Sequence, residues 1–291
     1  MLNDAIISQV MNGFSIVAIL LIVSLGLAII FGVAGVINMA HGEFIMIGAY
    51  TAAVVQNFLG GNTFISIPVA FVVVAAVGVL VERTVIRFLY DRPLETLLAT
   101  WGVGIVCQVL IKLIFGPELY YVGAPKVLDG AFQVIGNLPF SYYRLFLILV
   151  SIALLLITYI LLYRTDFGLK VRAVRRNRSI TGCLGIDTAR VDLVIFAFGS
   201  GLAGIAGAIV APIKTVSPTM GFPYAVDAFM VLILGGVGKL VGVFAGSVVI
   251  GESETVLSFI YNNVIGQMLV FITIVVLIRI WPRGLFGYQE R

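Results

Sequence analysis

Eight long apolar stretches constrain the fold of this chain more than any other feature. They occupy residues 12–37, 44–59, 64–81, 94–115, 145–162, 193–213, 226–250 and 256–278. A helix needs about 20 apolar residues to cross the hydrocarbon core of a bilayer, and these stretches lack the alternation of barrel strands. The pattern predicts an all-α fold: a polytopic membrane helical bundle of about eight segments, with at least one broken or re-entrant segment.

Composition extends this prediction to the whole chain. Of the 291 residues, 61% are hydrophobic and 11% are charged, whereas a soluble domain is about 45–50% apolar. We therefore expect one transmembrane domain over residues 1–291, without a large extramembrane domain. The net charge of +4 is typical of a membrane protein with basic loops facing the cytoplasm. We therefore expect the chain to lie in a lipid bilayer and not to bind nucleic acid.

Basic residues gather in two loops, 82–93 and 164–192, which together hold ten of the 18 lysines and arginines. The positive-inside rule places both loops in the cytoplasm and the loop 116–143, which contains Lys126 as its basic residue, on the opposite side. The tail carries further arginines, Arg279, Arg283 and Arg291, and should be cytoplasmic as well.

A cytoplasmic tail creates a parity problem. Three full crossings after Asp192 would leave the tail outside. We therefore predict that the stretch 226–250 breaks at its glycines, 235–238, into two half-helices that enter and leave from the outer side. Irregular backbone at membrane depth is tolerated only beside protein or a water-filled cavity, so a translocation pathway is expected at the break.

The N-terminal half contains a similar interruption, a polar segment at residues 38–43 between two apolar arms. Interrupted segments in both halves indicate a solute path between pseudo-repeats. Two alternatives remain open: His41 and Glu43 could lie in a hydrated interfacial turn, and Asp227 could be a helix N-cap. The candidate pathway residues are Asn38, His41, Glu43, Tyr224, Asp227, Gly235 and Gly236.

The basic loop 164–192 predicts two short helices. Apolar residues recur at helical spacing from Phe167 to Val174, Asn177 or Ser179 can cap a second helix, and Gly185 can end it. An uncharged helix on a basic collar suits docking into a cytoplasmic partner, although a basic surface helix lying on anionic lipid is the alternative. The candidate docking residues are Asn177, Arg178, Ser179, Ile180, Thr181, Gly182, Cys183, Leu184 and Gly185.

The chain lacks sequence signals for chemistry of its own. A nucleotide-binding loop at Lys239 would need glycine where Ile233 stands and serine or threonine where Leu240 stands. Cysteine and histidine residues show no metal-ligand spacing. We therefore expect no enzyme activity, no ATP hydrolysis on this chain, no cofactor and no metal.

Several motifs resemble a known family. They lie at residues 36–43, 82–102, 177–186, 234–238 and 283–286. These motifs are similar to those of the permease subunits of branched-chain amino-acid-type ABC importers, and the resemblance extends from about residue 10 to the tail. Within the family, residues 94–102, 183–186 and 226–230 look most like the urea-uptake permeases.

The resemblance implies a permease subunit of a bacterial inner-membrane importer. Its partners would be a second permease subunit, two cytoplasmic ABC ATPases and an extracytoplasmic solute-binding protein, and the family's coupling helix would map onto residues 177–185. Urea is the expected cargo, with branched-chain or other amino acids as the alternative. An ion-coupled secondary transporter is a further alternative, and it predicts transport by the isolated chain.

Overall fold

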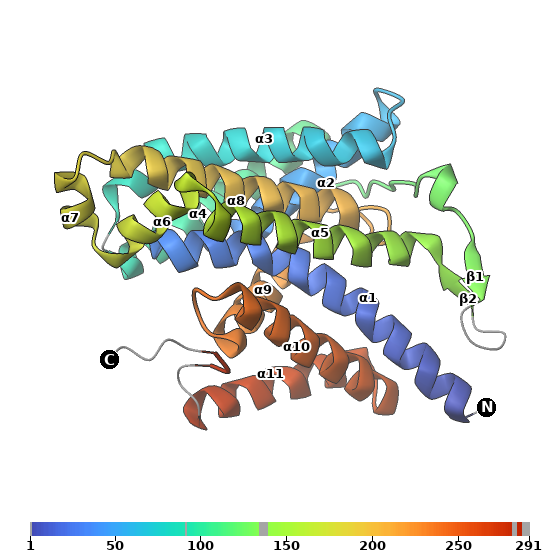
Figure 1. The fold of residues 1–291 in the computed structure, drawn as a ribbon. Coiled ribbons are helices and arrows are strands. Elements are labelled where there is room, and N and C mark those ends of the chain that lie inside the picture. The colour runs from blue at the N-terminus through green and yellow to red at the C-terminus, as the bar shows by residue number, and fades with distance from the viewer. Residues whose placement is uncertain (1, 91, 134–138, 281–283, 287–291) are drawn as a thin grey trace.

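The computed structural model describes residues 2–90, 92–133, 139–280 and 284–286, so Asp91, Arg283 and Arg291 lie outside the described residues. The described chain forms an elongated bundle of helices (Figure 1). In chain order the helices are α1 (Leu2–Ile29) with a π-helical extension (Ile30–Ala34), α2 (His41–Asn57), α3 (Thr63–Thr84), α4 (Pro93–Phe115), α5 (Tyr142–Arg164), α6 (Asp166–Arg176), α7 (Arg178–Cys183), α8 (Thr188–Val210), α9 (Gly221–Gly235), α10 (Leu240–Ile260) and α11 (Asn263–Ile280). Short 3-10 turns lie at Ile86–Phe88 and Lys126–Leu128, and an antiparallel pair joins β1 (Ala131–Gln133) to β2 (Pro139–Ser141).

Seven of the described helices are long and apolar enough to cross a membrane: α1 with its extension, α3, α4, α5, α8, α10 and α11. The predicted polytopic helical bundle is therefore confirmed. Two expected segments are shorter, because α2 has 17 residues and α9 has 15. At 1.5 Å per residue such helices reach only about 23–26 Å, less than the roughly 30 Å hydrocarbon core.

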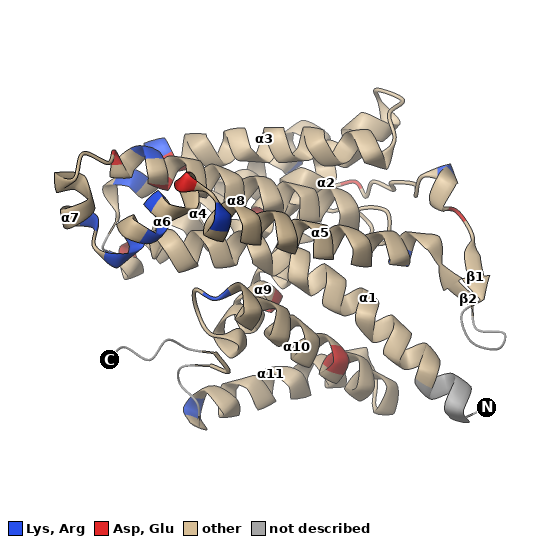
Figure 2. Cartoon of the chain, viewed as in Figure 1, with Lys and Arg blue, Asp and Glu red and all other residues tan. Residues whose placement is uncertain are grey.

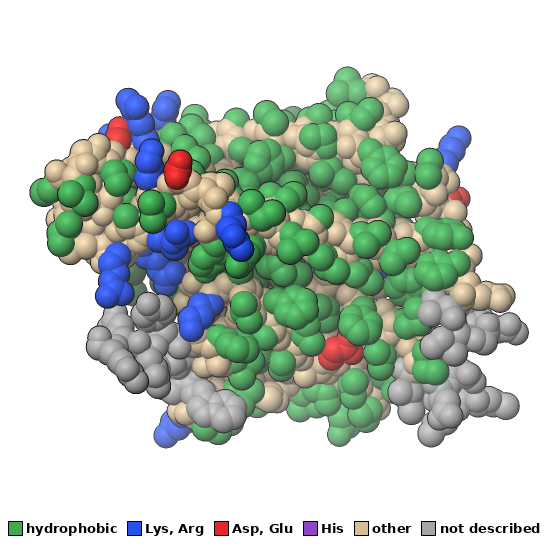
Figure 3. Space-filling view, in the orientation of Figure 1, with side chains coloured by type: hydrophobic (Ala, Val, Ile, Leu, Met, Phe, Trp, Pro, Cys, Tyr) green, Lys and Arg blue, Asp and Glu red, His purple; other side chains and the backbone are tan. Residues whose placement is uncertain are grey.

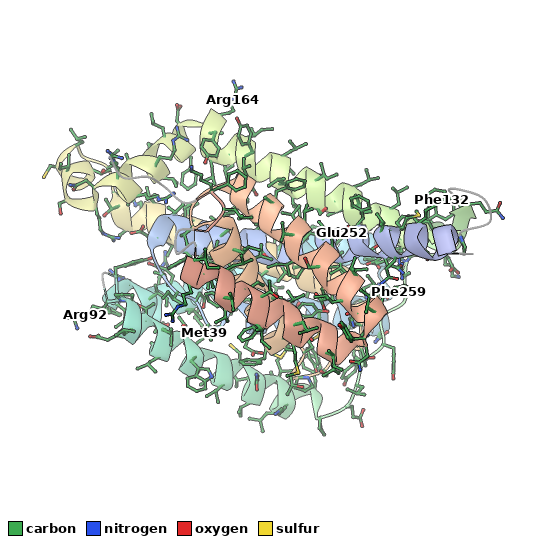
Figure 4. All side chains as sticks on the ribbon, turned by 90° about the horizontal axis from the view of Figure 1, so that it is seen from below. Met39, Arg92, Phe132, Arg164, Glu252 and Phe259 are labelled. Atoms are coloured by element: carbon green, nitrogen blue, oxygen red, sulfur yellow. The ribbon has the colours of Figure 1, made fainter. Side chains whose placement is uncertain are left out.

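Charged residues distinguish the two ends of the bundle. Lysines and arginines gather around α6 and α7 (Figure 2), and we call this the inner end. Arg92 and Arg164 lie toward the inner end, whereas Phe132 of β1 lies at the opposite, outer end (Figure 4). The two basic loops thus share one end of the bundle, as the positive-inside rule predicts.

The position of the predicted break in the stretch 226–250 is confirmed, because α9 ends at Gly235 and α10 begins at Leu240, but the predicted pair of half-helices entering and leaving from the outer side is wrong. α9 runs toward the inner end and α10 returns to the outer end, so α11 brings the tail back to the basic side (Figure 1). The turn between α9 and α10 lies at the inner end, where the carbonyl of Gly238 accepts a hydrogen bond of 3.1 Å from Arg175 of α6. α10 is a full span of 21 residues, so in this pair α9 is the half-helix and α10 is not.

Small residues of α8 form the centre of the packing. A Cβ atom at Gly204 would lie 2.5 Å from the Ala70 carbonyl oxygen of α3, and one at Gly199 would lie 2.8 Å from the Gly26 carbonyl oxygen of α1. A Cβ at Gly207 would overlap the backbone of α2 at Ile45. These close helix contacts depend on small residues, since only glycine lets these backbones approach so closely in lipid.

Candidate functional site

α2 begins inside the bundle and not at its surface. The π-helical extension of α1 ends at Gly35, whose φ of 68° is left-handed, and the chain then turns so that the Asn38 side-chain oxygen accepts the Ala40 N–H at 3.1 Å. Asn38 and His41 are fully buried, and Glu43 is 4% exposed. The hydrated interfacial turn considered for His41 and Glu43 is therefore wrong.

The N-terminus of α9 meets that of α2 in the interior. A Cβ atom on either Gly42 or Gly221 would overlap the backbone of the other helix. From this junction α2 runs outward and α9 runs inward, so two half-helices direct the positive ends of their dipoles toward one region. The junction depends on the irregular segment 211–220, which contains Pro212 and Pro218. Sequence reasoning separated the apolar stretches 193–213 and 226–250 but did not predict that α9 begins inside the bundle.

Three buried polar groups at this junction have unused hydrogen-bonding capacity. His41 Nε2 lies 2.9 Å from the Val23 carbonyl oxygen, to which it donates, so Nδ1 is an acceptor. Within the described residues, Asn38 Nδ2, His41 Nδ1 and Glu43 Oε2 have no hydrogen-bond partner. Buried polar atoms are normally paired, so this donor and these two acceptors stand out among the described residues. We call Asn38, His41 and Glu43 the junction cluster.

α4 supplies two contacts to the junction that sequence reasoning missed. Gln108 donates to Glu43 Oε1 at 2.8 Å, and the Thr100 hydroxyl accepts the Met39 N–H at 3.0 Å. Thr96, Thr100, Gly104 and Gln108 recur at intervals of four residues and therefore share one face of α4. This small and polar face within an apolar span is the signal that could have revealed the contacts.

Tyr224 and Asp227 lie on the first two turns of α9. The N-cap position of α9 is Met220, so the alternative of Asp227 as an N-cap is wrong. Asp227 instead lies near Glu254 of α10 and Gln267 of α11. Tyr224 and Asp227 thus follow the junction closely along α9. The residues around Asp227 come from α10 and α11, however, and are not those that surround the junction cluster.

Gly235 and Gly236 lie at the far end of α9, about 21 Å along the helix axis from Gly221. The tail covers the backbone there: the Leu285 N–H donates to the Leu234 carbonyl at 2.8 Å and the Phe286 N–H to the Gly235 carbonyl at 3.2 Å. The structure therefore does not bring Gly235 and Gly236 together with Asn38, because the helix between them is unbroken.

The loop 164–192 forms the two predicted helices, α6 and α7. The Asn177 side-chain oxygen caps α7 by accepting the Ile180 N–H at 3.0 Å, and Gly185, with φ of 81°, follows its end. Ile180 and Leu184 are 59% and 75% exposed. α7 therefore projects two apolar side chains from the basic end of the bundle.

Two members of the candidate docking set face inward instead. Thr181 is buried and its hydroxyl donates to the Asn177 carbonyl at 2.7 Å. Arg178 forms an ion pair of 2.6 Å with the buried Asp192 of α8, and its guanidinium lies 4.6 Å from the centre of the Tyr90 ring. Arg178 therefore holds α7 against the bundle.

Replacing Arg178 with alanine is expected to destabilise the fold by about 3 kcal/mol, because the buried Asp192 carboxylate loses its ion pair with Arg178. The measurement is thermal unfolding of the purified chain in detergent. Arg190→Ala is the matched control, because Arg190 pairs at 2.8 Å with Asp187 at an exposed site and should contribute little. Equal losses in both variants would contradict the anchoring role of Arg178.

The apolar surface and the buried junction of α2 and α9 together indicate a class of protein. Apolar side chains cover the middle of the face in view, with basic residues at its inner end (Figure 3). Helices of membrane-spanning length surround two half-helices, α2 and α9, whose N-termini meet beside buried polar groups. This architecture is that of a multi-pass membrane transport protein. This chain belongs to the family of branched-chain amino acid transport system permease components, whose model matches residues 9–278.

Curated relatives support this assignment over nearly the full chain. The chain is 24% identical to the high-affinity branched-chain amino acid transport system permease protein BraD of Pseudomonas aeruginosa, covering 98% of this chain and 96% of that protein. It is 30% identical to the probable permease protein LivH of Methanocaldococcus jannaschii, with coverage of 92% and 89%. It is 26% identical to LivM of Escherichia coli, with coverage of 92% and 67%. No solved structure gives a significant match.

These comparisons confirm the resemblance to the permease family and correct its finer part. The relatives above are described as permease proteins for branched-chain amino acids. They give no support to the closer likeness to urea permeases, and they favour the alternative of an amino-acid permease.

Proposed function

We propose that this chain is a permease subunit of an ABC importer that carries branched-chain amino acids across a bacterial inner membrane. The match of residues 9–278 to the permease family is the observation that carries the proposal. Similarity to both LivH and LivM supports a second, related permease subunit as a partner. A solute-binding protein would deliver the amino acid at the outer end, and residues 1–291 would act as one permease domain.

Energy would come from two ATPase subunits that bind the cytoplasmic coupling loop, residues 164–192. The exposed Ile180 of α7 and Leu184, which follows the helix, offer apolar anchors, and α6 adds basic residues next to them. Movement of α7 would reach the bundle through Arg178 and Asp192, which connect it to α8.

The junction cluster would form part of the solute path. An amino acid carries an ammonium and a carboxylate group, which match the Glu43 carboxylate and the helix N-termini of α2 and α9 respectively. Asn38 and His41 are fully buried here, so solute would reach them only when α2 and α9 separate. Asn38 would then use its free amide to hold the carboxylate.

Replacing Asn38 with alanine is expected to reduce ATP-dependent leucine uptake about tenfold. This factor corresponds to the loss of one hydrogen bond to the solute, worth about 1.4 kcal/mol. The measurement uses proteoliposomes containing the complete importer at saturating binding protein. Ser247→Ala is the matched control, because Ser247 is also buried but donates to Val243 within α10. Unchanged uptake in Asn38→Ala, with normal assembly, would remove Asn38 from the path.

The same vesicles test the class of transporter and its cargo. Leucine should be accumulated and urea should not, and accumulation should require ATP together with the partner subunits. Uptake of urea alone would overturn the amino-acid proposal. Accumulation by the isolated chain in an ion gradient would instead identify a secondary transporter.

A further inference from the structure

A cavity of about 60 Å³ lies at the inner end, between α1, α5, α6 and the turn from α9 to α10. Its lining combines apolar side chains, including Val33 and Leu240, with three cationic residues, Arg172, Arg175 and Lys239. We call it the inner cationic cavity. It is separate from the junction cluster, and its cations have no role in the solute path described above.

The two arginines are held in place by backbone groups. Arg175 Nη1 donates to the Gly238 carbonyl at 3.1 Å, and a side chain at Gly238 would collide with its guanidinium. Arg172 donates to the Leu162 carbonyl, and its guanidinium lies 5.5 Å from the centre of the Tyr163 ring. Each arginine thus uses few of its five N–H donors.

Arg172 and Arg175 bring positive charge to the cavity. No carboxylate of the described residues lies within ion-pair distance of Arg172 or Arg175. Positive charge without a carboxylate partner, fixed at the boundary between membrane helices and cytoplasm, attracts phosphate groups, which guanidinium binds with two parallel hydrogen bonds.

The apolar walls identify the source of the phosphate. A free phosphate ion gains nothing from Val33 or Leu240, whereas a phospholipid places its acyl chains against apolar helix surface and its phosphate among the cations. We propose that the inner cationic cavity binds the head-group phosphate of an anionic phospholipid of the inner leaflet. The proposal is independent of which solute is carried.

A lipid at this position would act on the coupling loop. Arg172 and Arg175 belong to α6, which leads directly to α7, and Gly238 belongs to the turn that ends α9. A phosphate held by both arginines would fix α6 against this turn. Anionic lipid is therefore expected to stabilise the arrangement of α6 relative to α9 and α10.

The test is native mass spectrometry of the purified full chain titrated with phosphatidylglycerol or phosphatidylcholine. Wild type should retain phosphatidylglycerol in preference, and Arg172→Gln/Arg175→Gln should bind it about thirtyfold more weakly, since each lost charge is worth close to a factor of five. The matched control is Lys170→Gln/Arg176→Gln, which removes the same charge from exposed positions of α6 outside the cavity. Arg172→Lys/Arg175→Lys should retain most of the binding, which a merely structural role would not predict.

Three results would overturn the proposal. The first is equal loss of phosphatidylglycerol in the cavity and control variants, which would indicate a diffuse surface charge effect. The second is displacement of the lipid by millimolar inorganic phosphate, which would identify a free-phosphate site. The third is unchanged lipid binding in Arg172→Gln/Arg175→Gln together with lost ATPase association, which would assign the arginines to the partner protein.

Discussion

Gly207→Leu is expected to prevent the chain from forming its folded bundle. Gly207 of α8 packs directly on α2, and a Cβ atom there would overlap the Ile45 carbonyl and lie 2.7 Å from the Ala49 nitrogen. Both neighbours are backbone atoms of a helix, so rotamer changes cannot relieve the collision and α2 must move away from α8. We expect a loss of more than about 3 kcal/mol, at or beyond the upper range for overpacked cores.

The measurement is the monodisperse fraction and the thermal unfolding temperature in detergent. Gly102→Leu is the matched control, because a Cβ atom at Gly102 of α4 would meet nothing within 4 Å. Gly207→Ala should show a smaller loss than Gly207→Leu, since it adds one methyl group. If Gly207→Leu unfolds at the same temperature as Gly102→Leu, the close contact between α2 and α8 is wrong.

Ile180→Asp/Leu184→Asp is expected to abolish binding of the ATPase subunits. Each apolar side chain would lose about 1.5–3 kcal/mol of burial in the partner's groove, and a carboxylate there would be costly to desolvate. The combined loss corresponds to more than hundredfold weaker association. Because Ile180 and Leu184 are 59% and 75% exposed in the isolated chain, membrane insertion and thermal stability should remain unchanged.

Copurification of the ATPases with the tagged permease measures this effect. Leu119→Asp/Val127→Asp is the control, because these residues are 56% and 83% exposed in the loop between α4 and α5, which the positive-inside rule places at the outer end. This control should assemble normally. Normal assembly of Ile180→Asp/Leu184→Asp would refute the coupling role of α7 while leaving the membership of the permease family intact.

The family and the helical fold follow from the sequence because both depend on local signals. Continuous apolar runs define the spans, and clustered arginines define the inner end. The capping residue Asn177 and the terminating Gly185 enclose α7, and both act on their immediate neighbours. The short motifs at residues 94–102, 183–186 and 226–230 predict urea as the cargo, which the relatives do not support.

The site depended on contacts between distant segments. Nothing local to Gly42 shows that it meets Gly221, or that Glu43 meets Gln108. The break at residues 235–238 was located correctly, but its depth was not, since depth is set by the length of α10 and by Arg175.

Hydrophobicity, charge and capping act over a few turns of chain, so they predict from the residues alone a helical membrane bundle with a basic inner end and a capped helix α7. The packed bundle was needed to show that α2 and α9 meet head to head, that Arg178 is an anchor, and that Arg172 and Arg175 line a cavity. Such arrangements depend on which backbones can approach closely, and small residues permit many approaches until all the helices are packed together.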